Sequence, residues 1–256
     1  MVAAWRAAQP AQGAPSASIR GPPQPVYNFY AEHCPRLPQP GCALSIARGC
    51  DADIADAPLR LWRDGAGGLR ALASVDLGSR GFAAPGPAGR LAGLVHTCAV
   101  YANSTRDETF ADYASHEWIH STWRDERDAA SLVALTHMEF HCDTPACPYW
   151  GTPLADADSW LTAVTLMASS DGGASWAHAR PPPAHIVAVS PYQWNASLGA
   201  ARVTFGFRSP SNIIKARDGF FYATVTAGWG VSLLGQQAGA CMMRTRDVAE
   251  IGRAHV

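Results

Sequence analysis

The chain has 256 residues, of which 48% are hydrophobic and 16% are charged, and its formal net charge at pH 7 is -1. This balance lacks the basic excess expected of a nucleic-acid-binding or anionic-membrane-binding protein, and no apolar run reaches the roughly 18 residues needed to span a bilayer. The 23 Gly, 19 Pro and nine Trp favour an all-β protein with many turns.

Residues 1–25 are rich in Ala, Pro and Gln and lack the apolar core of a signal peptide. We expect them to form a disordered leader ahead of a domain at 26–250. Two glycosylation sequons, at Asn103 and Asn195, favour a secreted or extracellular protein. The three cysteines nearest the start and the Cys142/Cys147 pair are candidates for disulfides. The seven cysteines are Cys34, Cys42, Cys50, Cys98, Cys142, Cys147 and Cys241.

The chain contains an internal repeat. Residues 56–76 align with residues 117–139, so that Asp56 matches Glu117 and each segment carries Trp-Arg-Asp at the same spacing. Residues 209–227 form a looser third copy around Arg217-Asp218-Gly219. Each copy has an apolar run, a polar turn and a second run rich in aliphatic or β-branched residues, which is the pattern of a β-hairpin.

A further apolar run that ends on Ser or Thr near an Asp follows each hairpin, at 96–107, 161–173 and 239–247. A fourth strand is expected at 175–178. A repeated four-stranded antiparallel unit of this length is typical of a β-propeller. The sequence therefore predicts an all-β propeller fragment of about three blades, from a five- or six-bladed propeller. The terminal "IGRAHV", residues 251–256, matches the translation of a common sequencing adapter, and we exclude it from the domain.

The segment "SSDGGASW", residues 169–176, fits the S-x-D-x-G-x-[ST]-W pattern of the Asp box, also called the BNR repeat. In this pattern Asp171 accepts backbone N–H groups, Gly173 adopts a positive φ, and Trp176 packs between strands. The motif marks a structural turn at a blade rim and is not catalytic.

Over residues 50–248 the chain resembles uncharacterised propeller proteins akin to sialidases and to five-bladed glycoside hydrolases. The resemblance rests on "CDADIADAPLRLWRD", "EWI", "LVALTHMEFH", "SSDGGASW", "SPSNIIKARDGFFYA" and "CMMRTRD". Met138 and Phe140 stand where many relatives have Asn and Tyr. The resemblance implies a fold more firmly than a reaction.

His116-Glu117-Trp118-Ile119-His120 spells H-E-x-x-H, the helical zinc signature of metalloproteases. The repeat places it on a strand, where the two histidines lie too far apart to chelate one ion. A zinc metalloprotease is therefore a minor alternative. His137, His141, Cys142 and Cys147 form a second group with zinc ligand types, for which a disulfide or free thiols are the alternatives. We expect no metal and no cofactor.

The carboxylates give the favoured chemistry. Asp56 and Glu117 occupy equivalent positions at the entry ends of innermost strands, and Glu139 lies at the end of a second strand. Acids on neighbouring blades of a propeller converge on a central funnel, and a pair of carboxyl groups is what glycoside hydrolysis needs. Asp56, Glu117 and Glu139 are the predicted catalytic residues, and Arg60, His137, His141 and Asn212 are the predicted substrate-binding residues.

The sequence thus favours a secreted glycoside hydrolase that acts on a carbohydrate or glycoconjugate through paired carboxylates. The alternative is a non-catalytic propeller module that binds glycans or proteins. A sialidase proper needs an arginine triad for its substrate carboxylate, and three such arginines are not evident. Nothing in the sequence indicates an oligomeric state.

Overall fold

The computed structural model describes residues 57–75, 78–84, 89–103, 109–141, 160–191, 205–228 and 238–251. Over these residues the chain is all-β, as predicted, with strands β1 to β13 and three single-turn 3-10 helices, which are η2 (Leu91–Gly93), η3 (Phe110–Asp112) and η5 (Val248–Glu250). None of the helices in these ranges is long and apolar enough to cross a membrane. The expected leader at 1–25, Asp56 and residues 252–256 lie outside the described residues.

The first sheet has the topology of a propeller blade. Its strands β1 (Arg60–Arg63), β2 (Leu69–Val75), β3 (Gly78–Ala84) and β4 (Val95–Asn103) pair antiparallel in chain order. The predicted hairpin over 56–76 is present as β1 and β2. The alignment of 96–107 with 161–173 as equivalent strands was wrong. The first of these ranges falls in β4, the fourth strand of its blade, whereas the third strand is β3. The sequence of β3, "GSRGFAA", has too few β-branched residues to indicate a strand.

The second blade contains β5 (Glu117–Arg124), β6 (Leu132–Phe140) and β7 (Leu161–Ser169), again antiparallel and consecutive. Its fourth strand is divided in two. Both β8 (Ala177–His178) and β9 (Ile186–Val189) pair with the outer edge of β7, and the segment 179–185 separates them. The strand expected at 175–178 is therefore present, but it is short and resumes later in the chain.

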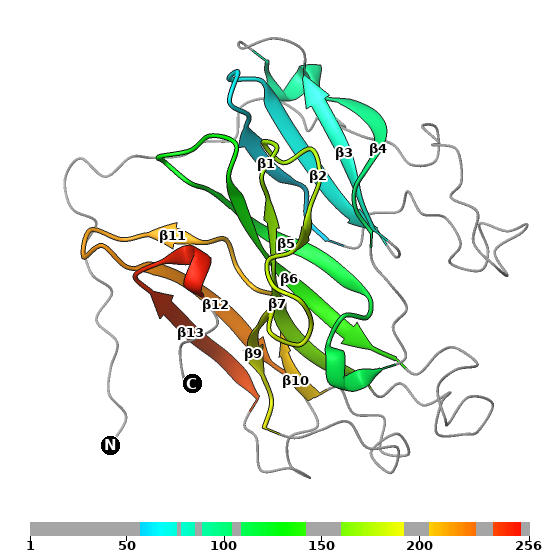
Figure 1. The fold of residues 1–256 in the computed structure, drawn as a ribbon, viewed down its shortest axis with the longest axis vertical. Helices are drawn as coiled ribbons and strands as arrows, with labels where there is room; N and C mark the ends of the chain where they lie inside the picture. The colour runs from blue at the N-terminus through cyan, green and yellow to red at the C-terminus, as the bar shows by residue number, and fades with distance from the viewer. Residues whose placement is uncertain are drawn as a thin grey trace, which may run out of the picture.

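The third blade is built from β11 (Ile214–Lys215), β12 (Phe221–Ala227) and β13 (Gly239–Thr245), which pair antiparallel as predicted. A strand without a counterpart in the repeat, β10 (Phe205–Arg208), pairs parallel with β7 and antiparallel with β12. This strand joins the second and third blades into one continuous sheet. In Figure 1 the sheets follow one another across the molecule, with β1–β4 above, β5–β7 in the middle and β11–β13 below.

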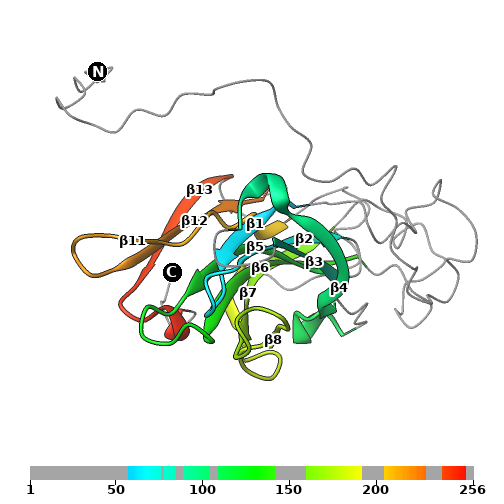
Figure 2. The same cartoon turned by 90° about the horizontal axis from the view of Figure 1, so that it is seen from above.

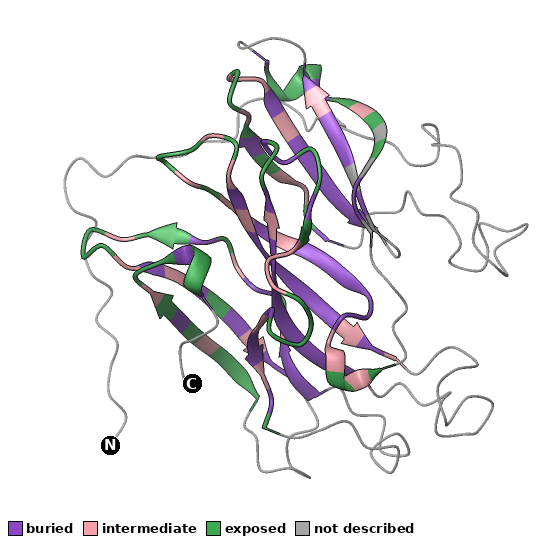
Figure 3. Cartoon of the chain, in the orientation of Figure 1, coloured by how far each residue is buried: buried purple, intermediate pink, exposed green. Residues whose placement is uncertain are grey.

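The second blade supplies the packing surface for both neighbours. One face of β6 carries Leu132 and Ala134 and packs with Trp62 and Leu72 of the first blade, whereas Leu135 packs toward Phe221 of the third. Such alternation follows from the two-residue period of a strand. Figure 3 shows the resulting concentration of buried residues in β6 and β7. The innermost strands β1 and β5 lie side by side in Figure 2, and Arg124 Nη1 donates to the Arg63 carbonyl at 3.3 Å.

The turn between β7 and β8 has the local geometry that its sequence predicts. Asp171 Oδ1 accepts the backbone N–H groups of Ala174 and Ser175, both at 2.9 Å. Gly173 has a φ of 88°, and Trp176 is 6% exposed. Trp62 of the first blade donates its indole N–H to the Gly172 carbonyl at 2.9 Å, so this turn also ties two blades together.

Candidate functional site

Glu117 and Glu139 lie at the same end of the second blade, because β5 begins where the antiparallel β6 ends. The turns at 125–131 and 169–176 lie at the other end. The register pairs Glu117 with Met138, the neighbour of Glu139 along β6. Directly opposed residues share a face of a sheet, whereas successive residues alternate. The two carboxylates therefore lie on opposite faces of the sheet, so Glu117 and Glu139 do not share one pocket. The predicted convergence of Asp56 with Glu117 involves a residue outside the described ranges.

Glu139 stands between two of the predicted binding residues. Its Oε2 lies 2.6 Å from His141 Nε2, and its Oε1 lies 3.3 Å from His137 Nε2, without the geometry of a hydrogen bond. The Glu139 side chain is 12% exposed. Burial opposes its ionisation, but the hydrogen bond from His141 and the charges of the neighbouring histidines outweigh burial and lower the pKa of Glu139. The carboxylate is thus held ionised at the edge of solvent.

Aromatic rings pack against the two histidines beside this carboxylate. His141 stacks on Trp160 with ring centroids 4.8 Å apart and an interplanar angle of 10°, and on its other side it stacks with His116 at 4.7 Å. His137 packs at 5.8 Å from Trp118, the residue opposite it on β5. Trp160 was not among the predicted site residues, and His116 was considered only as a ligand in the zinc pattern.

Arg60 and Asn212, the other predicted binding residues, meet each other. Arg60 Nη1 donates to Asn212 Oδ1 at 3.2 Å, which connects the innermost strand of the first blade to the segment before β11 in the third. His120 of β5 lies on the blade between them. Its imidazole is 5.4 Å from that of His137, and the charge of Arg60 helps to lower its pKa. One polar region, where the three blades approach each other, therefore contains Arg60, Asn212, His120, His137 and Glu139. The sequence analysis treated His120 only as a zinc ligand.

This region makes the protein acid-sensitive. Burial lowers the pKa of His120 to about 3 and that of His137 to about 4, so both stay neutral in the folded state while the unfolded chain binds their protons below about pH 6.5. The unfolded state therefore takes up more protons as the pH falls from about 6.5 to about 4. We expect each histidine to remove about 2 kcal/mol from the free energy of unfolding between pH 7 and pH 5. Urea titrations at the two pH values measure this, and an equally steep loss in His120→Asn would contradict it.

Glu117 occupies a different environment, on the opposite face. Its side chain is 1% exposed, its Oε1 accepts the Thr165 hydroxyl at 2.5 Å, and its Oε2 lies 2.5 Å from His178 Nε2. His185 Nε2 lies 3.6 Å from Oε1. Burial opposes ionisation, but the hydrogen bonds from His178 and Thr165, together with the nearby His185, lower the pKa of Glu117 to about 2. Sequence reasoning missed both histidines, because neither falls in an aligned part of the repeat.

The zinc-protease geometry is absent from H-E-x-x-H. Glu117 begins a β-strand, as the repeat predicts. His116 has a φ of 42° and its Nδ1 contacts the Ser115 hydroxyl at 2.8 Å, while His120 sits at an irregularity in the β5–β6 register. The two histidines are therefore not one helical turn apart. In the second group of possible zinc ligands, Cys142 and Cys147 lie outside the described residues, and so do the predicted disulfides. Among the described residues, Cys241 is a half-buried free thiol.

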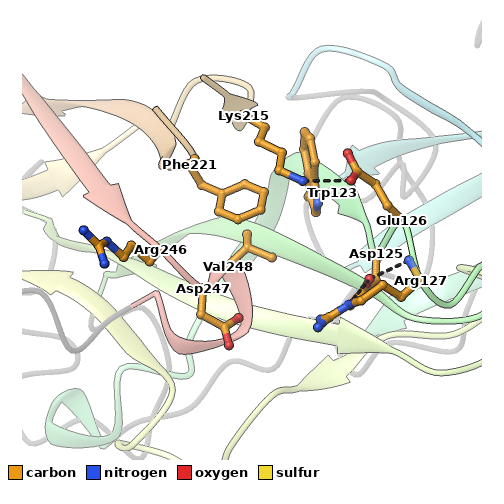
Figure 4. A pocket seen from close by; sticks show the side chains of 10 residues that line it. Trp123, Asp125, Glu126, Arg127, Lys215, Phe221, Arg246, Asp247 and Val248 are labelled. Atoms are coloured by element: carbon orange, nitrogen blue, oxygen red, sulfur yellow. Dashed lines mark hydrogen bonds and ion pairs between the residues drawn. The ribbon is translucent and has the colours of Figure 1, made fainter. Parts of the chain in front are cut away.

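A hollow of about 260 Å³ lies at the other end of the sheet, between the second and third blades. Figure 4 shows Trp123 and Phe221 on its wall, with Lys215 reaching Glu126 at 2.8 Å and Arg127 paired with Asp125. Four of its charged side chains are thus paired with each other at the surface. Because this hollow contains none of the predicted site residues, we place the candidate site at the opposite end, around Glu139.

No protein-family model matches this chain, and no curated protein sequence matches it. Among solved structures it is similar to an α-L-arabinanase of Penicillium chrysogenum complexed with arabinobiose, with 11% identity, a TM-score of 0.41, and coverage of 77% of this chain and 48% of that chain. It is also similar to the native arabinanase of Bacillus subtilis, with 9% identity, a TM-score of 0.32, and coverage of 77% and 75%. The chain therefore spans about half the length of the Penicillium enzyme. Neither protein is a sialidase, and no residue role is transferred from either.

Proposed function

We propose that the protein is a carbohydrate-active propeller whose ligand site surrounds Glu139 at the end of β6. The observation that carries this proposal is the partly exposed Glu139 carboxylate, which the hydrogen bond from His141 holds ionised, together with Trp160, whose ring stacks on His141. Aromatic faces stack on the apolar face of a sugar ring, and an ionised carboxylate accepts its hydroxyl groups. The region thus combines the two kinds of contact that sugars require.

The reaction that fits best is glycoside hydrolysis. An ionised carboxylate acts either as the base that activates water or as the nucleophile, and a second carboxylic acid protonates the leaving oxygen. Glu139 takes the first role in our proposal. Glu117 does not suit the second role, because its carboxylate is enclosed on the opposite face and has a pKa of about 2. We therefore assign the acid role to Asp56, the counterpart of Glu117 in the first blade, which lies outside the described residues.

The substrate-binding roles go to Arg60 and Asn212, whose side chains meet beside His120. A guanidinium and an amide can both bind the hydroxyl groups of a sugar, whereas a sialic acid carboxylate requires an arginine cluster. Secretion remains part of the proposal, on the strength of the sequons and the cysteine content.

A glycan panel tests the proposal. The purified 256-residue chain is assayed for hydrolysis and binding on neutral and acidic oligosaccharides, among them arabinobiose. Glu139→Gln should lower the turnover of any hydrolysed member at least about 100-fold while it leaves binding within a few-fold, because the amide keeps the shape but loses the charge. Asp56→Asn should act similarly.

The exposed Glu126 provides the matched control, since Glu126→Gln also removes one carboxylate from the same blade. Hydrolysis that survives Glu139→Gln would eliminate the assigned role. Binding of a glycan without turnover would favour the non-catalytic glycan-binding module instead.

A further inference from the structure

Three side chains able to ligate a metal ion meet inside the second blade, on the face opposite Glu139. They are Glu117 from the start of β5, His178 from β8, and His185 just before β9. One ligand atom from each lies within 4.8 Å of the other two. Within the described parts of the chain this is the one group of three or more such residues that meets this distance.

The cluster is buried to a degree that needs an explanation. The side chains of Glu117 and His185 are 1% and 0% exposed, and His178 is 24% exposed. Among the described residues, nothing bonds to the buried His185 Nδ1, and the other ring nitrogen, Nε2, is the one that faces Glu117. His178 is partly exposed, so the cluster is accessible from solvent on that side.

The distances are those of a site that a small movement would complete. Tetrahedral zinc with bonds of about 2.0–2.2 Å holds its ligand atoms about 3.3 Å apart. Each histidine faces a different oxygen of the Glu117 carboxylate. His185 Nε2 lies 3.6 Å from Oε1, and His178 Nε2 lies 2.5 Å from Oε2, a pair that needs to separate by less than an ångström. The ion would take the place of the proton on His178 Nε2 that faces Glu117.

A candidate for the fourth ligand lies beside the cluster. The Tyr113 carbonyl is 3.1 Å from His185 Nε2, and Tyr113 adopts a left-handed conformation with a φ of 55°. Such a conformation is rare for a residue with a bulky side chain, and it persists only where the surrounding structure enforces it. It turns the Tyr113 carbonyl toward the cluster, so that this oxygen or a water molecule completes a four-coordinate shell.

We propose that Glu117, His178 and His185 form a binding site for a divalent transition-metal ion of the Zn²⁺ class. One carboxylate oxygen and two imidazole nitrogens are the donor set that such ions prefer. The ion ties the two short pieces of the outer strand, β8 and β9, to the innermost strand β5, which makes the site structural. This proposal does not depend on the proposed carbohydrate activity, and glycan binding or turnover does not enter its test.

Metal binding to the purified chain tests the site. The protein is stripped with a chelator and titrated with Zn²⁺ against a chromophoric competitor, and its metal content is measured after gel filtration. We expect one equivalent of tightly bound Zn²⁺ and a rise in Tm of about 5–10 °C when the free ion is in 100-fold excess over its Kd. With Co²⁺ in place of Zn²⁺, the d–d absorption bands of a tetrahedral site should appear.

The decisive variant is His178→Gln, which keeps an N–H donor for Glu117 but removes the imidazole ligand. It should retain the Tm of the stripped protein and weaken Zn²⁺ binding at least about 100-fold, which exceeds the 10- to 100-fold effect of residues behind the ligands. His141→Gln is the matched control, because His141 makes the corresponding 2.6 Å contact with Glu139 on the other face.

Substoichiometric metal in the unmodified chain would overturn the proposal. So would unchanged affinity in His178→Gln, or an equal loss in His141→Gln. If His178→Gln does not fold, His185→Gln is measured in the same way, with the same two outcomes.

Discussion

Glu117→Ala should lower the free energy of unfolding by about 3–5 kcal/mol at pH 7, the loss expected when one partner of a buried ion pair is removed. The carboxylate is 1% exposed and serves His178, His185 and Thr165 at once. Its removal leaves an imidazolium and a hydroxyl without their acceptor in the interior, in addition to a cavity. Urea denaturation in the presence of a chelator measures the effect without any contribution from bound metal.

The exposed Glu126 provides the comparison for this prediction. Its carboxylate pairs with Lys215 at 2.8 Å, but the side chain is 63% exposed. Glu126→Ala should cost no more than about 1 kcal/mol, because solvent screens an ion pair at the surface. Equal losses in the two variants would mean that Glu117 contributes no more than a surface residue, and that the ion-pair network around it does not stabilise the blade.

Gly173→Ala should destabilise the protein by about 2–5 kcal/mol. The φ of 88° costs about 1–2 kcal/mol for a residue with a Cβ. The added carbon would also lie 2.5 Å from Cζ2 of Trp62, whose indole is fixed by its hydrogen bond to the Gly172 carbonyl. Relief of that overlap requires movement of a buried ring at the junction of two blades, for which about 1–3 kcal/mol is typical.

Gly219→Ala separates the two contributions. Gly219 has nearly the same φ, 82°, but its Cβ would meet no atom within 4 Å among the described residues other than its chain neighbours. Its loss should therefore be that of the backbone alone, about 1–2 kcal/mol. Thermal or urea denaturation of both variants gives the difference. If the two glycines cost the same, the contact between Trp62 and the turn at 169–176 does not constrain the blades.

The regular parts of the fold could be predicted from the sequence, since they depend on local patterns. The hairpins β1–β2, β5–β6 and β11–β12 each have a polar turn between runs of strand-forming residues, and the repeat fixed their relation. The local conformation of Gly173 and the bonds to Asp171 follow from the motif itself. In contrast, β3 has a glycine-rich sequence that is stable as a strand only because β2 and β4 flank it. Strands β9 and β10 likewise depend on tertiary structure, because they pair with β7 across long stretches of chain.

The candidate site could be predicted only in part. Glu139, His137 and His141 are close in sequence and lie together in the structure. Alignment of the repeat marked Glu117 as important, but it could not give the face of the sheet on which the carboxylate lies. That face depends on pairing register, and a shift of one residue would move every side chain to the other side. The repeat also said nothing of His178 and His185, which reach Glu117 from the outer strand of the blade.

The sequence by itself determined the all-β class, the blade repeat and the conformation of the Asp171 turn, since each depends on residues that are neighbours along the chain. Only the tertiary structure decided which polar groups share a site. It separated Glu117 from Glu139, brought Arg60 to Asn212 across 152 positions, and enclosed Glu117 with two histidines some sixty residues away. The physical reason is that strand pairing and the packing of blades set these distances. Both are cooperative properties of the whole sheet, and no local pattern encodes them.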